Sequence, residues 1–288
     1  MKCINKRFVR VCSLLLVCSL CTISGTGCGE NRLEDAFEAD LPGIGIQTSE
    51  ESSKIPYFAS DLCVTDTDVQ DIEADTEDAL AACFFNLNEK KVLYAKNIHE
   101  RMYPASTTKI MTALVALDKG DLDAQTTVSK EAITFSESGV STAKLKEGDV
   151  LTLRQLLYAL LTVSANDAAN VIAEQIAGSQ DAFVEMMNQE AQKIGATNTH
   201  FVNANGLHSE DHYTTVYDLY LMFNAAMQHE EFLQMLQEKE YQASYQAADG
   251  TTVEAVWSTT NQFTKGDVTV PDGVTAVGGK TGTTTAAM

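Results

Sequence analysis

The sequence predicts an α/β fold of the α+β type, in which antiparallel strands from both ends of the folded region flank a helical middle. Three observations support this prediction. Two apolar runs separated by turn residues lie between residues 80 and 95, helical periodicity dominates residues 106–227, and a late strand pattern covers residues 274–284. Apolar residues make up 44% of the chain, which is enough to bury a sizeable core.

The first predicted elements form a β-hairpin. Residues 80–87 suit a buried strand, residues 86–90 supply turn chemistry, and residues 92–95 give the second strand. A helix is then expected to open near Ser106 and to close at Gly120.

Further helices fill the middle of the chain. Thr152 and Gln155 match a capping box at the start of a leucine-rich helix that ends near Ser164. Asp167 begins the next helix, which closes near Gly178. Two more helices are expected over residues 183–194 and 215–227, and a turn-rich region follows residue 249.

Charge divides the chain into three parts. The formal net charge is -20, which argues against nucleic-acid binding because neutralising phosphates requires clustered Lys and Arg. Residues 1–29 carry +4, residues 30–78 carry -13, and the remainder carries -11. We therefore predict a signal peptide over residues 1–28, an acidic disordered tether over residues 29–78 and a folded domain over residues 79–288.

The N-terminal segment is typical of an export signal. A basic start precedes thirteen uncharged, mostly apolar residues at 11–23, a stretch too short to span a bilayer comfortably. Thr26-Gly27-Cys28 resembles a bacterial lipobox, which predicts lipidation at Cys28 and an extracytoplasmic domain anchored to the cytoplasmic membrane. Gly25 replaces the usual Leu, so ordinary cleavage and an uncleaved anchor stay open as alternatives.

A serine three residues before a lysine on a helix places both side chains on one face, so the lysine can take the proton of the hydroxyl. Ser106 and Lys109 stand at a predicted helix start. Ser141 and Lys144 repeat the spacing, but the glycines around them argue against a helix, and we interpret this pair as a chance match.

Two further motifs follow the first in order. They are Ser164-x-Asn166 in an interhelix loop and Lys280-Thr281-Gly282 on the late strand, and the three together are typical of penicillin-binding proteins and serine β-lactamases. Other segments extend the likeness from about residue 82 onward. They are Val92-Leu93-Tyr94-Ala95-Lys96, Tyr103-Pro104-Ala105, Leu145-Lys146-Glu147-Gly148, Phe201-Val202-Asn203, Gly206-Leu207, His212-Tyr213-Thr214-Thr215 and Thr260-Asn261.

With these segments the chain resembles the low-molecular-mass penicillin-binding proteins that act as serine-type D-alanyl-D-alanine carboxypeptidases. The resemblance implies a transpeptidase-like fold, removal of the terminal D-alanine from peptidoglycan stem peptides, acylation by β-lactam antibiotics and a place in cell-wall organisation. It implies no cofactor and no metal.

The resemblance also implies a role for each motif residue. Ser106 would be the nucleophile, Lys109 its general base, and Ser164 the relay of a proton to the leaving amine. Asn166 would hold the lysine or the substrate amide. Lys280 and Thr281 would bind the terminal carboxylate, Gly282 would let the substrate lie close to the strand, and the backbone N–H groups of Ser106 and Thr283 would bind the oxyanion.

Other readings remain beside this one. His208 and His212 are spaced like metal ligands, but they stand in a predicted loop, where a structural hydrogen-bonding role for His212 is favoured. A β-lactamase would need a deacylating Glu between the second and third motifs, for which the sequence offers no convincing candidate. A non-catalytic cell-wall-binding protein is the third alternative, because relatives continue after the Lys-Thr-Gly strand whereas this sequence stops at Met288. We therefore expect that the C-terminal strands are missing and that the chain as given does not turn over substrate.

Overall fold

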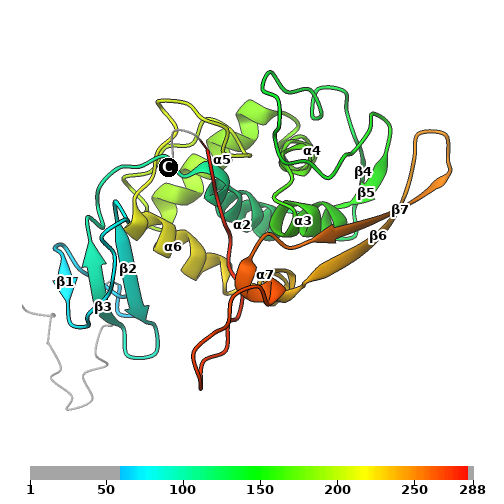
Figure 1. The fold of residues 1–288 in the computed structure, drawn as a ribbon. Coiled ribbons are helices and arrows are strands. Elements are labelled where there is room, and N and C mark those ends of the chain that lie inside the picture. Colours follow the sequence, from blue (N-terminus) through cyan, green and yellow to red (C-terminus); the bar gives the residue numbers. More distant parts are fainter. Residues whose placement is uncertain (1–58, 285–288) are drawn as a thin grey trace, which may run out of the picture. The chain divides into compact units, whose positions relative to one another are not determined.

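A computed structural model describes residues 59–284 of the chain (Figure 1). Two antiparallel sheets lie on either side of a group of helices. The elements are β1 (Val69–Gln70), β2 (Ala82–Asn86), β3 (Lys91–Lys96), the 3-10 turn η1 (Ala105–Thr108), α2 (Lys109–Lys119), β4 (Gln125–Thr127), β5 (Val150–Thr152), α3 (Leu153–Thr162), α4 (Asn166–Ala177), α5 (Gln180–Lys193), α6 (Val216–Ala226), α7 (Glu230–Gln237), β6 (Glu240–Gln246), β7 (Thr252–Ser258) and α8 (Gln262–Lys265). The predicted fold class, with antiparallel sheets and a helical middle, is confirmed.

The described unit begins at Ala59, so it includes residues that were expected to belong to the acidic tether. Cys63 is fully buried, and β1 pairs with β3 in the three-stranded sheet, whose order is β1-β3-β2. The domain start expected at residue 79 therefore lies too late. The acidic composition of this stretch indicated a tether. A single buried cysteine and two paired residues leave too little periodicity in the sequence to indicate a folded segment.

The second sheet has the order β4-β5-β6-β7. Its hairpin β6–β7 was not predicted, although one face carries apolar side chains at every second position, as half-buried strands do. The alternate face is polar apart from Val256, and it hides this pattern from a search for apolar runs. The inward residues are Tyr241, Ala243, Tyr245, Val253, Ala255 and Trp257.

Helix α2 lies at the centre of the fold and packs against α3, α4, α5 and α6 (Figure 1). Its residues Ile110, Met111, Leu114 and Val115 are buried, because apolar positions three and four residues apart meet neighbours on several sides. The predicted capping box of α3 is present: the N–H of Gln155 donates to Thr152 Oγ1 at 3.2 Å and the Gln155 side chain accepts in return.

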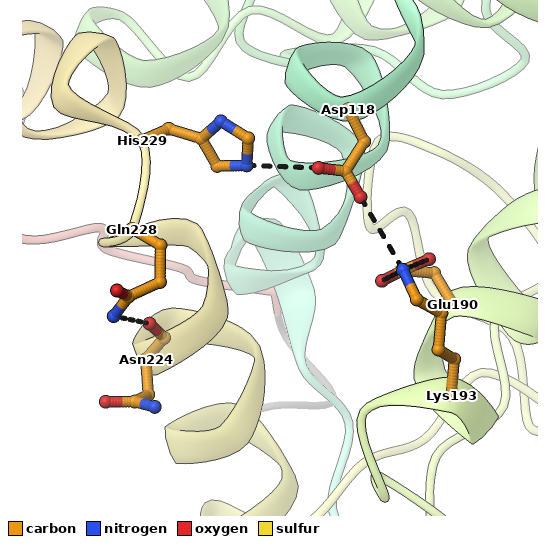
Figure 2. A network of polar contacts seen from close by, with 6 residues as sticks. All are labelled: Asp118, Glu190, Lys193, Asn224, Gln228 and His229. Atoms are coloured by element: carbon orange, nitrogen blue, oxygen red, sulfur yellow. Dashed lines mark hydrogen bonds and ion pairs between the residues drawn. The ribbon is translucent and has the colours of Figure 1, made fainter. Parts of the chain in front are cut away.

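Polar contacts fix the C-terminal end of α2 (Figure 2). Asp118 lies 3.1 Å from His229 Nε2 and 3.9 Å from Lys193 Nζ, and the lysine also pairs with Glu190 at 2.9 Å. These pairs join α2 to α5 and to the turn between α6 and α7. Lys109 stands at the N-terminal end of α2, so it belongs to a helix whose C-terminal end is held by these contacts.

The late strand predicted over residues 274–284 is wrong in one respect. The segment runs extended past α7 to the start of α2 (Figure 1), but no backbone ladder joins it to another strand among the described residues. Side chains hold it instead: Asn261 Nδ2 donates to the carbonyl of Gly279 at 3.2 Å, and the hydroxyls of Thr260 and Thr281 lie 2.9 Å apart. A strand forms only with a pairing partner, which the composition of one segment does not reveal.

Candidate active site

Ser106 stands in the 3-10 turn that leads into α2, as the sequence predicted for a helix start. The residue before it, Ala105, has a φ of 48°, a left-handed conformation that costs an alanine about 1 kcal/mol. Gly206 packs against this turn, and a Cβ at that glycine would lie 2.0 Å from the carbonyl oxygen of Ala105. Only glycine fits there, so the loop after α5 and the nucleophile turn hold each other in place.

Lys109 occupies the first turn of α2 and is fully buried. Its Nζ lies 3.0 Å from Ser106 Oγ, 2.6 Å from Asn166 Oδ1 and 2.5 Å from the carbonyl oxygen of Asn205. The last two partners can only accept hydrogen bonds. A neutral amine would donate one N–H to each of them and direct its lone pair at the Ser106 hydroxyl.

Electrostatics favour that neutral form. Burial lowers the pKa of Lys109 well below its ordinary value, and the positive charge of Lys280 lowers it further. Asp167 acts in the opposite direction and raises this pKa. The combined effect of burial and of the Lys280 charge on this pKa thus outweighs the effect of Asp167, and the amine is suited to accept a proton from Ser106.

The second and third motifs meet beside this pair. Lys280 Nζ donates to Ser164 Oγ at 2.9 Å, and burial lowers the pKa of Lys280 to about 8. Ser164 has a φ of 58°, which is uncommon for a residue with a side chain and typical of strained positions at functional sites. A chain of polar groups therefore connects the Lys-Thr-Gly segment, the interhelix loop and the nucleophile helix.

Gly282 lies against the nucleophile turn. A Cβ at this position would lie 2.9 Å from the backbone nitrogen of Thr107 and 3.0 Å from that of Ser106. The missing side chain thus makes room for the nucleophile turn of the protein itself, and the expectation that Gly282 also lets the substrate lie close to this segment stays a prediction.

A cavity of about 190 Å³ opens in front of the nucleophile. Ser106, Asn166 and Thr283 share its wall, so the structure brings residues of all three motif segments to one space. The oxyanion role of the Ser106 and Thr283 N–H groups stays a prediction. The other lining residues are Glu137, Ser138, Gly139, Val140, Ser141, Asn205, Gly206, Leu207 and Thr284.

Two backbone groups that contribute to this site were not predicted from the sequence. The carbonyl oxygen of Asn205 accepts a hydrogen bond from Lys109 Nζ, but a backbone group leaves no sequence signature, and Asn205-Gly206 indicated only a turn. Ser141 belongs to the pair interpreted as a chance match, and no helix forms there, as expected. Its carbonyl oxygen nevertheless accepts a hydrogen bond from the N–H of Asn166 at 2.8 Å, which places residue 141 at the cavity.

The two histidines have separate partners. The ring of His208 lies 4.6 Å from that of Tyr103, while His212 Nε2 lies 2.8 Å from Thr108 Oγ1 and His212 Nδ1 accepts from the N–H of Val202. The predicted structural role of His212 is confirmed. Cys28, the expected lipidation site, lies outside the described residues. Within residues 59–284 no helix has the length and apolarity needed to cross a bilayer.

Comparison with known proteins agrees with this geometry. Residues 68–288 match the family described as D-alanyl-D-alanine carboxypeptidase. Carboxypeptidase DacF of Bacillus subtilis is 38% identical over 53% of this chain and 40% of its own length, and DacB2 of Mycobacterium tuberculosis is 40% identical over 53% of this chain and 52% of its own. The chain thus spans about two fifths to one half of these relatives. The crystal structure of the Streptomyces K15 DD-transpeptidase superposes with a TM-score of 0.68 at 31% identity, covering 75% of this chain and 84% of that one. This chain therefore belongs to the D-alanyl-D-alanine carboxypeptidase family.

Proposed function

We propose that this protein is a serine-type D-Ala-D-Ala carboxypeptidase that removes the terminal D-alanine of peptidoglycan stem peptides and is acylated by β-lactams at the same serine. The contact of 3.0 Å between Ser106 Oγ and the buried Lys109 Nζ is the observation that carries this proposal. Family membership supports the substrate class.

The proposed reaction has two steps. Ser106 Oγ attacks the carbonyl carbon between the two D-alanines while its proton passes to Lys109. The C–N bond then breaks, Ser164 passes a proton to the departing amine and regains the proton held by Lys109, and D-alanine leaves. Water attacks the resulting ester, which releases the shortened peptide and restores the serine hydroxyl.

The remaining motif residues would bind the charges that this reaction presents. Lys280, which is hydrogen-bonded to Ser164, would pair with the terminal carboxylate together with Thr281. The N–H groups of Ser106 and Thr283 would stabilise the oxyanion, and Asn166 would hold Lys109 in place.

Penicillin labelling with intact-mass detection tests the proposal. The wild-type protein should gain the mass of one penicillin, Ser106→Ala should take none, and Ser141→Ala should still take the label. Retention of the label by Ser106→Ala would refute the assignment of the nucleophile. Release of D-alanine from a peptide ending in D-Ala-D-Ala then tests the substrate, and the same assay on the 288-residue chain tests the expectation that this chain does not turn over substrate.

The same acyl-enzyme can also transfer its peptide to an amine, and the Streptomyces K15 neighbour is named a DD-transpeptidase. Adding an amine acceptor such as glycine to the D-alanine release assay separates the two outcomes. A carboxypeptidase yields chiefly the hydrolysed peptide, whereas a transpeptidase yields the glycine adduct.

We further propose that the domain acts outside the cytoplasmic membrane and is anchored by lipid at Cys28. Support comes from the cell-wall substrate of the family and from the basic and apolar N-terminal sequence. Cys28→Ser should abolish lipid labelling and move the protein from the membrane fraction. Unchanged processing and fractionation would exclude the lipoprotein.

A further inference from the structure

Asp167 follows Asn166 in the first turn of α4 and is only 1% exposed. Its Oδ1 accepts hydrogen bonds from the N–H groups of Ala143 and Ala168, both at 2.9 Å, and its Oδ2 accepts from the N–H of Leu145 at 3.1 Å. All three partners donate, so an ionised carboxylate satisfies every one of them.

The backbone around Lys144 is shaped to receive this carboxylate. Lys144 has a φ of 63°, and this left-handed residue turns the N–H groups on both of its sides toward one point. Successive N–H groups that converge in this way form an anion-binding concavity. Ala143 and Leu145 are buried beside it, so the concavity is anchored in the core.

A second contact joins the same two segments. The N–H of Asn166 donates to the carbonyl oxygen of Ser141 at 2.8 Å. Residues 137–141 line the cavity in front of Ser106, and no helix or strand is assigned between residues 128 and 149. The contacts with Asn166 and Asp167 therefore fix this wall directly to the residue that binds Lys109.

Asp167 also contributes charge at the base. The charged or titratable groups that act on Lys109 electrostatically include Lys280, Asp167 and His212. Burial lowers the pKa of His212 to about 4, which keeps that ring neutral near pH 7. Asp167 is thus the negative group that opposes Lys280 at the nucleophile helix.

We propose that Asp167 is a positioning residue with two roles: it holds residues 141–145 as a fixed wall of the substrate cavity, and its charge balances that of Lys280 at the general base. This inference rests on the proposed acyl-enzyme function. The first role depends on the geometry of the carboxylate and the second on its charge, so different substitutions separate them.

Two variants and one control form the test. Asp167→Asn removes the charge and turns an N–H2 group toward a backbone N–H, whereas Asp167→Glu keeps the charge on a longer side chain. Asp218→Asn is the matched control, because Asp218 is 2% exposed in the first turn of α6 and accepts from Asn198 and Thr199, neither of which lines the cavity. The measurements are the rate constant of penicillin acylation between pH 5 and 9 and backbone hydrogen exchange over residues 137–145.

Neutral Lys109 is the reactive form, so acylation falls as pH drops through its pKa. Removing a negative neighbour lowers that pKa. In Asp167→Asn the acid limb, meaning the low-pH fall of the acylation rate constant, should therefore move to lower pH by roughly half a unit or more. Its plateau rate should fall about tenfold or more as exchange over residues 141–145 rises. Asp167→Glu should show the lower plateau and faster exchange with the acid limb unmoved.

The control fixes the interpretation. Asp218→Asn should leave both the acid limb and the exchange of residues 141–145 unchanged. An unmoved acid limb in Asp167→Asn would overturn the charge role, and unchanged exchange in both Asp167 variants would overturn the wall. If Asp167→Asn does not fold, the plateau and exchange of Asp167→Glu still decide the wall. Failure of the wild-type protein to react with penicillin would instead refute the proposed function, while the exchange comparison would still test the wall.

Discussion

Protonation of His212 is expected to destabilise the domain together with its nucleophile turn. The residue is 2% exposed and lies in a polar contact of 2.8 Å with Thr108, which directly precedes Lys109. Nδ1 accepts from the N–H of Val202 at 3.1 Å, so the neutral ring carries its proton on Nε2. A second proton on Nδ1 would face that N–H group and break the contact.

The magnitude follows from the pKa difference. Burial, supported by the charges of His200, His208 and Lys109, lowers the pKa of His212 from 6.5 to about 4. Between these values the unfolded chain binds a proton that the folded chain does not. The free energy of unfolding therefore keeps its full value above pH 6.5, falls as pH decreases, and has lost about 3 kcal/mol near pH 4.

Urea unfolding of the wild-type protein and His212→Gln from pH 7 to 4.5 measures this effect. Burial raises the pKa of the carboxyls of Asp167 and Asp218, which has the opposite sign but is shared by both proteins. The wild type should lose roughly 2 to 3 kcal/mol more than the variant over this range. The exposed His99→Gln serves as control and should follow the wild type. Parallel curves for wild type and His212→Gln would refute the reasoning.

Three further outcomes are expected. Gly206→Ala places a Cβ 2.0 Å from the carbonyl oxygen of Ala105, whereas Gly139 has a positive φ but no atom within 4 Å. Gly206→Ala should therefore lower the free energy of unfolding by roughly 2 to 3 kcal/mol more than Gly139→Ala. Penicillin acylation of Gly206→Ala should also slow about 100-fold, and equal effects of the two variants would contradict this packing. Lys109→Arg should abolish acylation at every pH between 6 and 9, because a guanidinium stays protonated, and a near-normal rate would remove the lysine as base. Lys144→Gly relieves a φ of 63° and should raise the free energy of unfolding in urea by about 0.5 to 1 kcal/mol, whereas a loss would show that the lysine side chain supports the fold.

Local signals in the sequence predicted the helices between residues 106 and 227 because their causes are local, whereas α7 and α8 were not predicted. The capping box of Thr152 and Gln155 acts within one turn, and the spacing of Ser106 and Lys109 acts within one helix face. The contact between Lys280 and Ser164 joins residues far apart in the chain. The family resemblance implied only that the two motifs share one site, since no local rule predicts a contact between residues so far apart.

Features that depend on partners were missed or misplaced. Residues 274–284 have the composition of a strand, but the pairing of a strand is a property of two segments. The carbonyl oxygen of Asn205 and the N–H groups around Lys144 are backbone atoms whose direction depends on φ and ψ. A pattern search over side chains cannot detect either of them.

Several features of the site lower the stability of the folded domain, and packing elsewhere in the domain must offset them. Ala105 and Ser164 both adopt left-handed backbone, and Lys109 is buried with an amine that burial drives toward neutrality. Left-handed residues with side chains cost about 1 kcal/mol or more each, and a buried amine loses the hydration of its charged form. The same features are what reactivity requires: the turn presents Ser106 Oγ to the cavity, and the neutral amine can accept its proton. The leucine-rich core of α3 and the packing of α2 against four helices supply the stability that allows this arrangement to persist.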